Sequence, residues 1–72
     1  IEIFSENVKR YPNSANVYDS LGEGYENNNQ IDLARKNYQK AYELGKSTDH
    51  PYTSVYLSNL ERVKKSTNRT QK

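Results

Sequence analysis

The feature that most constrains this chain is an internal spacing of 34 residues between positions of matching size and hydrophobic character. Four pairs show the spacing: Phe4 with Tyr38, Val8 with Tyr42, Tyr18 with Tyr52, and Leu21 with Val55. Few other positions agree, so the repetition is confined to residues suited to packing. A period of this length indicates stacked supersecondary units, each of which buries its apolar side against a neighbour.

Helical periodicity accompanies the repeat from the start of the chain. Ile1, Phe4 and Val8 lie three and four residues apart, as on one side of a helix. This first helix is expected to end near Arg10, because Pro12 disfavours the α region for the residue before it. No segment alternates with a period of two for long enough to predict a strand. The periodicity therefore predicts an all-α fold, in which short connections make consecutive helices antiparallel neighbours.

Two further helices are expected in the middle of the chain. The second begins at a cap, Asn13 or Ser14, and runs to about Asn28. The third covers about 31–44, where Gly45 is placed to stop it. The apolar stripes of these helices are Tyr18, Leu21, Gly22 and Tyr25 in the second, and Ile31, Ala34, Tyr38, Ala41 and Tyr42 in the third.

A fourth helix follows, with Ser47, Thr48 or Asp49 as its cap and Pro51 in its first turn. Its expected apolar face consists of Tyr52, Val55, Tyr56, Leu60 and Val63. From residue 66 onward the sequence is polar and without period. The pattern predicts a flexible basic tail over 66–72.

The segment Tyr18-x₂-Leu21-Gly22-x₂-Tyr25, followed by Ala34-x₃-Tyr38 and Ala41, resembles the tetratricopeptide repeat, whose pattern is W-x₂-L-G-x₂-Y…A-x₃-F. The resemblance covers residues 1 to about 65 and implies a fragment of a helix-turn-helix α-solenoid with about four helices. It assigns 1–12 to the last helix of a preceding repeat, 13–48 to a complete repeat and 49–65 to a capping helix. Tyrosines stand where the family has tryptophan and phenylalanine. Tyr56 stands in the register of Gly22, and this bulky ring suggests that the array ends there.

A glycine inside a helix costs about 0.8–1.0 kcal/mol relative to alanine, so Gly22 calls for a packing reason. We expect that it lets the facing helix approach closely near Ala34, with large rings filling the grooves around the crossing. The expected packing set is Phe4, Tyr18, Leu21, Gly22, Tyr25, Ala34, Tyr38 and Ala41.

Charge is divided along the chain, whose net charge is +2. Residues 61–72 hold five of the eleven basic residues against one acid, whereas no Lys or Arg occurs between residues 11 and 34. At 100° per residue, one flank of the second helix collects Asn16, Asp19, Glu23, Glu26 and Asn27. In the tetratricopeptide family this helix lines the concave groove, so the flank is a candidate site for a basic or amide-rich peptide. The alternative is a solvated helix face whose acidity has no function.

Several function classes lack support in the sequence. There is no cysteine, the single histidine is His50, and no glycine-rich phosphate loop occurs, so neither catalysis, a metal site nor a cofactor is expected. The carboxylates are expected on exposed faces, without apolar neighbours to raise their pKa values. The basic tail lacks aromatic residues for stacking on bases, and no apolar run is long enough for a bilayer. Neither nucleic acid nor membrane is an expected partner, and the cellular compartment is not indicated.

The sequence thus predicts a non-catalytic module for protein–protein interaction or docking. One alternative is a structural appendage at the C-terminal end of a larger enzyme, because YPNSANVYDSLGEGY is similar to repeats found behind bacterial serine hydrolase and esterase domains. The chain begins without an initiator Met, which favours a piece of a longer protein. A second alternative is self-association through exposed apolar positions such as Ile3, Leu57 and Leu60.

Overall fold

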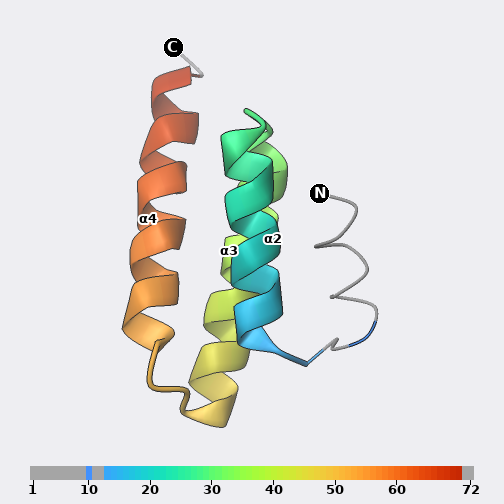
Figure 1. Cartoon of the computed structure of the whole chain (residues 1–72). Helices are drawn as coiled ribbons and strands as arrows, with labels where there is room; N and C mark the ends of the chain where they lie inside the picture. Colours follow the sequence, from blue (N-terminus) through green and yellow to red (C-terminus); the bar gives the residue numbers. More distant parts are fainter. Residues whose placement is uncertain (1–9, 11–12, 71–72) are drawn as a thin grey trace.

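The computed structural model describes residue 10 and residues 13–70, and over this part of the chain it consists of three antiparallel helices (Figure 1). Helix α2 is Ala15–Asn27, α3 is Ile31–Thr48 and α4 is Thr53–Thr70. Helix α3 packs against both α2 and α4 and is central. These residues contain no strand, which confirms the all-α prediction for them. The predicted first helix, including Phe4 and Val8, lies outside the described residues.

The start and end of α2 lie close to the predicted positions. Ser14 is the N-cap, with extended backbone angles, and its hydroxyl accepts a hydrogen bond of 3.4 Å from the amide of Val17. The helix ends at Asn27, and Asn29 then adopts a left-handed φ of 64°. Asparagine tolerates that conformation better than most residues. The turn brings α3 back antiparallel to α2.

The boundaries of α3 and α4 differ from the predicted ones. Helix α3 continues through Gly45 to Thr48, and Asp49, whose φ is 53°, caps its C-terminal end. Helix α4 begins only at Thr53, after Pro51, so Pro51 lies in the preceding turn. The predicted stop at Gly45 is wrong because this glycine is buried in the packing of α3 against α4.

The turn before α4 is built on His50. The backbone amide of Tyr52 donates to His50 Nδ1 at 3.1 Å, and the Thr53 hydroxyl donates to the His50 carbonyl at 2.6 Å. At its other end α4 extends to Thr70, so residues 66–70, for which the sequence predicted a tail without helical periodicity, are helical. The helix contains no glycine or proline that would stop it.

The core surrounds α3 in two clusters. One contains Ala34, Tyr38, Leu60 and Val63, and the other contains Ala15, Ala41 and Tyr56. The predicted stripes of α2 and α3 are therefore confirmed: Leu21, Gly22, Ala34, Tyr38 and Ala41 are buried, and Tyr18, Tyr25, Ile31 and Tyr42 are half-buried. The predicted face of α4 is right for Tyr56, Leu60 and Val63 but wrong for Tyr52 and Val55. Tyr56, Leu60 and Val63 form a narrow stripe on α4 that packs against Ala34, Tyr38 and Ala41 of α3.

Two glycines allow tyrosine rings to pack against helix backbones. A Cβ atom at Gly22 would lie 2.8 Å from Cδ1 of Tyr38, so the ring of Tyr38 occupies the space that a side chain would take. The group facing Gly22 is thus this ring, one helical turn after the Ala34 position that we predicted. At Gly45, an added Cβ would lie 3.1 Å from Cδ2 of Tyr56. Tyr56 does not prevent a close helix crossing, because Gly45 makes room for its ring.

Candidate binding face

Helix α4 directs two polar groups at the predicted groove flank of α2. The Tyr56 hydroxyl donates to Oδ1 of Asn16 at 2.6 Å, and the Asn59 amide donates to Oδ1 of Asp19 at 2.9 Å. Tyr56 and Asn59 are three residues apart on α4, and Asn16 and Asp19 are three residues apart on α2. Two of the five predicted groove residues therefore contact α4 directly.

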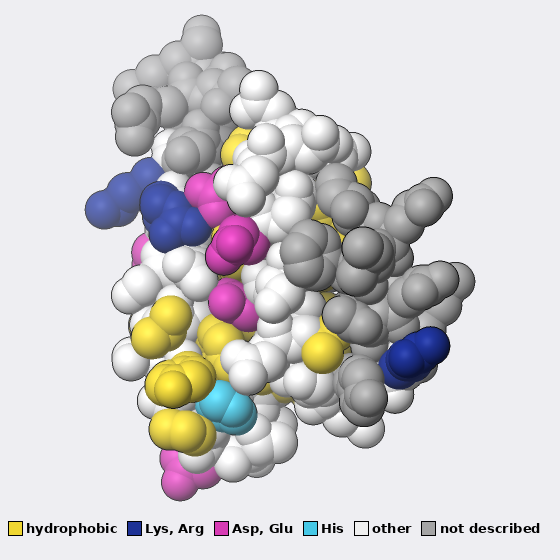
Figure 2. Space-filling view, viewed as in Figure 1, with side chains coloured by type: hydrophobic (Ala, Val, Ile, Leu, Met, Phe, Trp, Pro, Cys, Tyr) yellow, Lys and Arg dark blue, Asp and Glu magenta, His cyan; other side chains and the backbone are white. Residues whose placement is uncertain are grey.

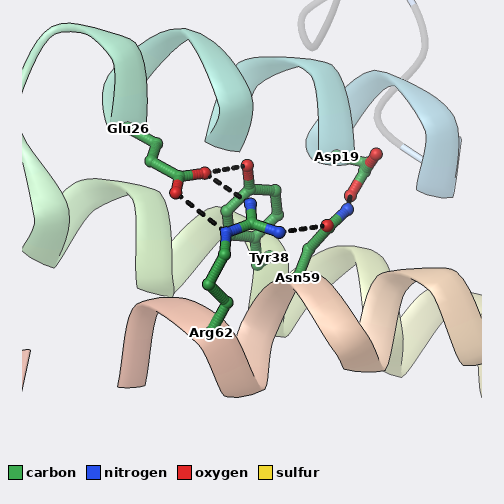
Figure 3. A network of polar contacts seen from close by, with 5 residues as sticks. All are labelled: Asp19, Glu26, Tyr38, Asn59 and Arg62. Atoms are coloured by element: carbon green, nitrogen blue, oxygen red, sulfur yellow. Dashed lines mark hydrogen bonds and ion pairs between the residues drawn. The ribbon is translucent and has the colours of Figure 1, made fainter. Parts of the chain in front are cut away.

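A third predicted residue, Glu26, is held by Arg62 in the two-pronged geometry that a guanidinium offers a carboxylate. Arg62 Nε donates to Glu26 Oε2 at 3.0 Å, and Nη2 donates to Oε1 at 2.6 Å (Figure 3). The remaining nitrogen, Nη1, donates to Oδ1 of Asn59 at 3.0 Å. The hydroxyl of Tyr38 donates to Glu26 Oε1 at 2.7 Å.

These contacts form one continuous chain, which we call the polar bridge. Its members, in order of contact, are Asp19, Asn59, Arg62, Glu26 and Tyr38 (Figure 3). It joins α2, α3 and α4, so it ties the two outer helices to each other and to the central one. Among the described residues, no buried side-chain nitrogen or oxygen lacks a hydrogen-bond partner. The two buried tyrosines, Tyr38 and Tyr56, both donate their hydroxyls to an acceptor, as a buried phenol requires.

The two carboxylates of the polar bridge are shifted in opposite directions. Hydrogen bonds from Arg62 lower the pKa of Glu26 below its ordinary value, and the hydroxyl of Tyr38 adds to the effect. Burial raises the pKa of Asp19, and the negative charge of Glu23 raises it further, against the hydrogen bond from Asn59. The prediction that no carboxylate has a raised pKa is therefore wrong for Asp19, because α4 covers part of it.

Glu23 and Asn27, the other two predicted residues, are exposed. Glu23 lies between Asp19 and Glu26 along α2, and its charge acts on Asp19. Arg62, the basic residue that α4 places beside these carboxylates, forms its ion pair with Glu26. Figure 2 shows acidic side chains in a column over α2, with basic side chains to one side on α4. The predicted flank is thus divided into three residues bonded to other helices and two that face solvent.

The α4 partners of this face were missed at the sequence level. The sequence groups Arg62 only with the other basic residues of 61–72, and it predicts no role for Asn59. The available signal was the three-residue spacing of Tyr56, Asn59 and Arg62, which places polar groups along one side of a helix beside its apolar stripe. That signal shows a shared flank, but it does not show which helix lies opposite.

The described part of the chain also bears on metal binding, membrane insertion and self-association. Its His, Asp and Glu residues form no group of three or more that could hold a metal ion. None of its helices combines the length and apolar character needed to cross a bilayer. Of the residues proposed for self-association, Leu60 is buried in the core, Leu57 is half-buried and Ile3 lies outside the described residues. The exposure predicted for Leu60 is wrong.

No protein-family model, curated protein or solved structure matches this chain. What the chain does is therefore inferred from its own residues.

Proposed function

We propose that this chain is a protein-interaction module of the tetratricopeptide type, and that the face shared by α2 and α4 holds a basic or amide-rich segment of another protein. The observation that carries the proposal is an excess of negative charge. Asp19, Glu23 and Glu26 lie along one side of α2, and α4 supplies Arg62 to Glu26. Within the described residues, neither Asp19 nor Glu23 has an ion-pair partner.

The packing around α3 supports the repeat part of the proposal. Gly22 is covered by the Tyr38 ring, and Ala34 and Ala41 are fully buried at the crossing of antiparallel helices. Small residues at the closest approach, with rings beside them, are what a stacked helix-turn-helix unit requires. In this proposal residues 1–12 supply a preceding helix, so that about four helices form a solenoid fragment.

The electrostatics of α2 favour a cationic ligand. Asp19 and Glu23 are four residues apart on the helix, and like charges at that spacing destabilise a helix by about 0.2–0.5 kcal/mol. A lysine or arginine of a ligand, placed beside both carboxylates, would turn this repulsion into attraction. Asn27, one turn beyond Glu23, offers an exposed amide that pairs with amide side chains or with a peptide backbone.

The proposal is tested first by the class of peptide that binds. An array of octapeptides, sorted into Lys/Arg-rich, Asn/Gln-rich and Asp/Glu-rich groups, would be probed with the labelled chain. We expect binding in the first two groups and weaker binding at 0.5 M salt than at 0.05 M, because salt screens exposed charges. Binding confined to the acidic group, or to no group, would contradict the proposal.

A matched pair of variants tests the position of the site. Glu23→Lys reverses a charge on the proposed face, and Glu61→Lys makes the same change at an exposed position of α4. With a Lys/Arg-rich peptide from the array, Glu23→Lys should weaken binding by roughly three- to tenfold, which is the range for reversing one partly exposed charge. Glu61→Lys should leave the affinity nearly unchanged. Equal losses in both variants would show that only net charge matters.

A further inference from the structure

The head group of Arg62 lies among three residues of the polar bridge, one from each helix. Glu26 accepts from Nε at 3.0 Å and from Nη2 at 2.6 Å, and Oδ1 of Asn59 accepts from Nη1 at 3.0 Å. The central carbon of the guanidinium lies 5.9 Å from the centroid of the Tyr38 ring. Figure 3 shows these groups around the Arg62 side chain. We call Glu26, Asn59 and Tyr38 the guanidinium seat.

The chemistry of the guanidinium seat suits arginine better than lysine. A guanidinium is planar and holds its donors in a fixed fork, so it bonds both oxygens of one carboxylate and still reaches a third acceptor. It also lies over aromatic rings more often than an ammonium does. An ammonium is a compact charge without this fork. The seat therefore distinguishes the two cations by geometry as well as by charge.

The present occupant of the seat is accessible to solvent. The side chain of Arg62 is 52% exposed, whereas that of Glu26 is 23% exposed. Ion pairs at such exposure contribute little to stability. If Arg62 turned into solvent, α4 would still be bonded to α2 through the hydrogen bonds that Asn16 and Asp19 accept. Emptying the seat therefore leaves two direct contacts between the outer helices in place.

Two further carboxylates lie beside the seat along α2. Glu23 precedes Glu26 by three residues and Asp19 precedes Glu23 by four, and such residues are neighbours on a helix surface. Neither Glu23 nor Asp19 has an ion-pair partner in the part of the chain that the structure describes. A peptide arginine held at Glu23 is one helical turn from the seat, so a second arginine of the same peptide can reach it. That second arginine and Arg62 would compete for the same oxygens.

We propose that the guanidinium seat is a subsite for an arginine of the ligand, and that Arg62 is a built-in competitor for it. The inference rests on the proposed function, because it concerns the ligand of the face shared by α2 and α4. It adds that this ligand is recognised through arginine, and that the chain weakens its own binding by filling the seat. Removing Arg62 therefore strengthens binding. Removing a residue that only tied α4 to α2 would weaken binding or leave it unchanged.

Two octapeptides test the inference, one that alternates arginine with glycine and one that alternates lysine with glycine. Each is titrated to about 1 mM, which reaches weak binding, into the full ¹⁵N-labelled chain. Arg62→Gln should bind the arginine peptide roughly three- to tenfold more tightly than the unaltered chain does, and it should gain less for the lysine peptide. The control is Arg35→Gln, the same substitution at an exposed position of α3, which should leave both affinities nearly unchanged.

A second variant keeps the test decisive if Arg62→Gln does not fold, which circular dichroism at 222 nm would reveal. Arg62→Lys retains the charge beside Glu26 but loses the fork, so it competes less well for the seat. Its affinity for the arginine peptide should lie between those of the unaltered chain and Arg62→Gln.

The inference fails if neither substitution at Arg62 tightens binding of the arginine peptide, or if the two peptides gain equally. Binding of both peptides by the unaltered chain, with no gain in the variants, would remove the competitor and leave the proposed function standing. If no form of the chain binds either peptide, the inference is wrong, and the amide-rich peptides of the array alone decide the proposed function.

Discussion

On both sides of α3 a glycine packs against a tyrosine ring, but the two contacts differ in how well they would accept a larger side chain. Toward α2, the backbone of Gly22 makes room for the ring of Tyr38; toward α4, the backbone of Gly45 makes room for the ring of Tyr56. Both rings are 1% exposed, and both hydroxyls reach acceptors on α2. The comparison shows how a chain with few aliphatic residues builds a core: tyrosine rings fill it, and their hydroxyls end at a polar flank.

The difference lies in what surrounds each glycine. A Cβ at Gly22 would meet three atoms of the Tyr38 ring at 2.8–3.1 Å, and that ring is enclosed. A Cβ at Gly45 would first meet the Thr53 hydroxyl at 2.9 Å, with the Tyr56 ring at 3.1 Å. Rotating the Thr53 hydroxyl away gives up its hydrogen bond to the His50 carbonyl, whereas relieving the contact at Gly22 requires an enclosed ring to move with its helix. The α2–α3 contact is therefore the less forgiving one.

The largest effect is expected from overfilling that contact. Gly22→Leu should destabilise the fold by at least about 3 kcal/mol, which is at the upper end for overpacking and enough to unfold a chain this small. Gly22→Ala should still cost about 1 kcal/mol, although alanine favours a helix. Urea unfolding followed by circular dichroism at 222 nm measures both. Stability of Gly22→Leu within about 0.5 kcal/mol of the unaltered chain would rule out the tight contact.

Removal of either buried tyrosine hydroxyl should cost less stability than overfilling the contact at Gly22, and the two costs should differ. Tyr38→Phe removes a donor to Glu26, whose side chain is only 23% exposed, and should cost about 1 kcal/mol. Tyr56→Phe removes a bond to Asn16, which is exposed and can accept from water instead, so about 0.5 kcal/mol is expected. The same unfolding experiment ranks the two variants, and the reverse order would show that the polar bridge adds little to the α2–α3 contact.

Gly45→Ala tests the tolerance of the α3–α4 side. The substitution removes a glycine from a helix interior, a gain of about 0.8–1.0 kcal/mol, and crowds the Thr53 hydroxyl and the Tyr56 ring. These effects oppose each other, so stability should stay within about 1 kcal/mol of the unaltered chain and above that of Gly22→Ala. Thermal melts of the two alanine variants, run side by side, check this. A lower melting temperature for Gly45→Ala would invert the comparison.

The smallest changes in folding stability are expected from replacing the carboxylates of Asp19 and Glu26, and the two changes should have opposite signs. Folding lowers the pKa of Glu26. The ionised carboxylate therefore stabilises the fold at pH values above 4.5, its ordinary pKa, and this stabilisation is lost as the pH falls through the pKa of the folded state. The pKa of Asp19 is raised, so the fold loses stability as pH rises from 3.8 through the raised value. Asp19→Asn should therefore stabilise the chain at pH 7 by a few tenths of a kcal/mol, whereas Glu26→Gln should destabilise it.

Urea titrations at half-unit steps from pH 3 to pH 7 resolve these signs. The advantage of Asp19→Asn over the unaltered chain should shrink as the pH falls, and so should the deficit of Glu26→Gln. If both variants lose stability at pH 7, Asp19 is stabilising in the folded chain, and its desolvation is outweighed by the hydrogen bond from Asn59.

The predictable part of the site was the part carried by α2. Asn16, Asp19, Glu23, Glu26 and Asn27 share a flank because a helix turns by 100° per residue, and this requires no knowledge of the neighbouring helices. The partners on α4 could not be found in the same way, because their choice depends on the register between helices. Whether Glu23 binds a ligand stays a prediction.

By itself the sequence determined the helical fold of the described residues, a helix start at Asn13 or Ser14, a helix end near Asn28 and the burial of Gly22, Ala34, Tyr38 and Ala41. These features follow from local backbone preferences and from hydrophobic periodicity, which act over a few residues. Only the tertiary structure decided that Gly45 packs against α4 and does not end α3, that Arg62 forms an ion pair with Glu26, and that Tyr52 and Val55 are exposed. Those outcomes depend on the register and rotation of each helix relative to its neighbours. Contacts between residues far apart in the sequence determine both.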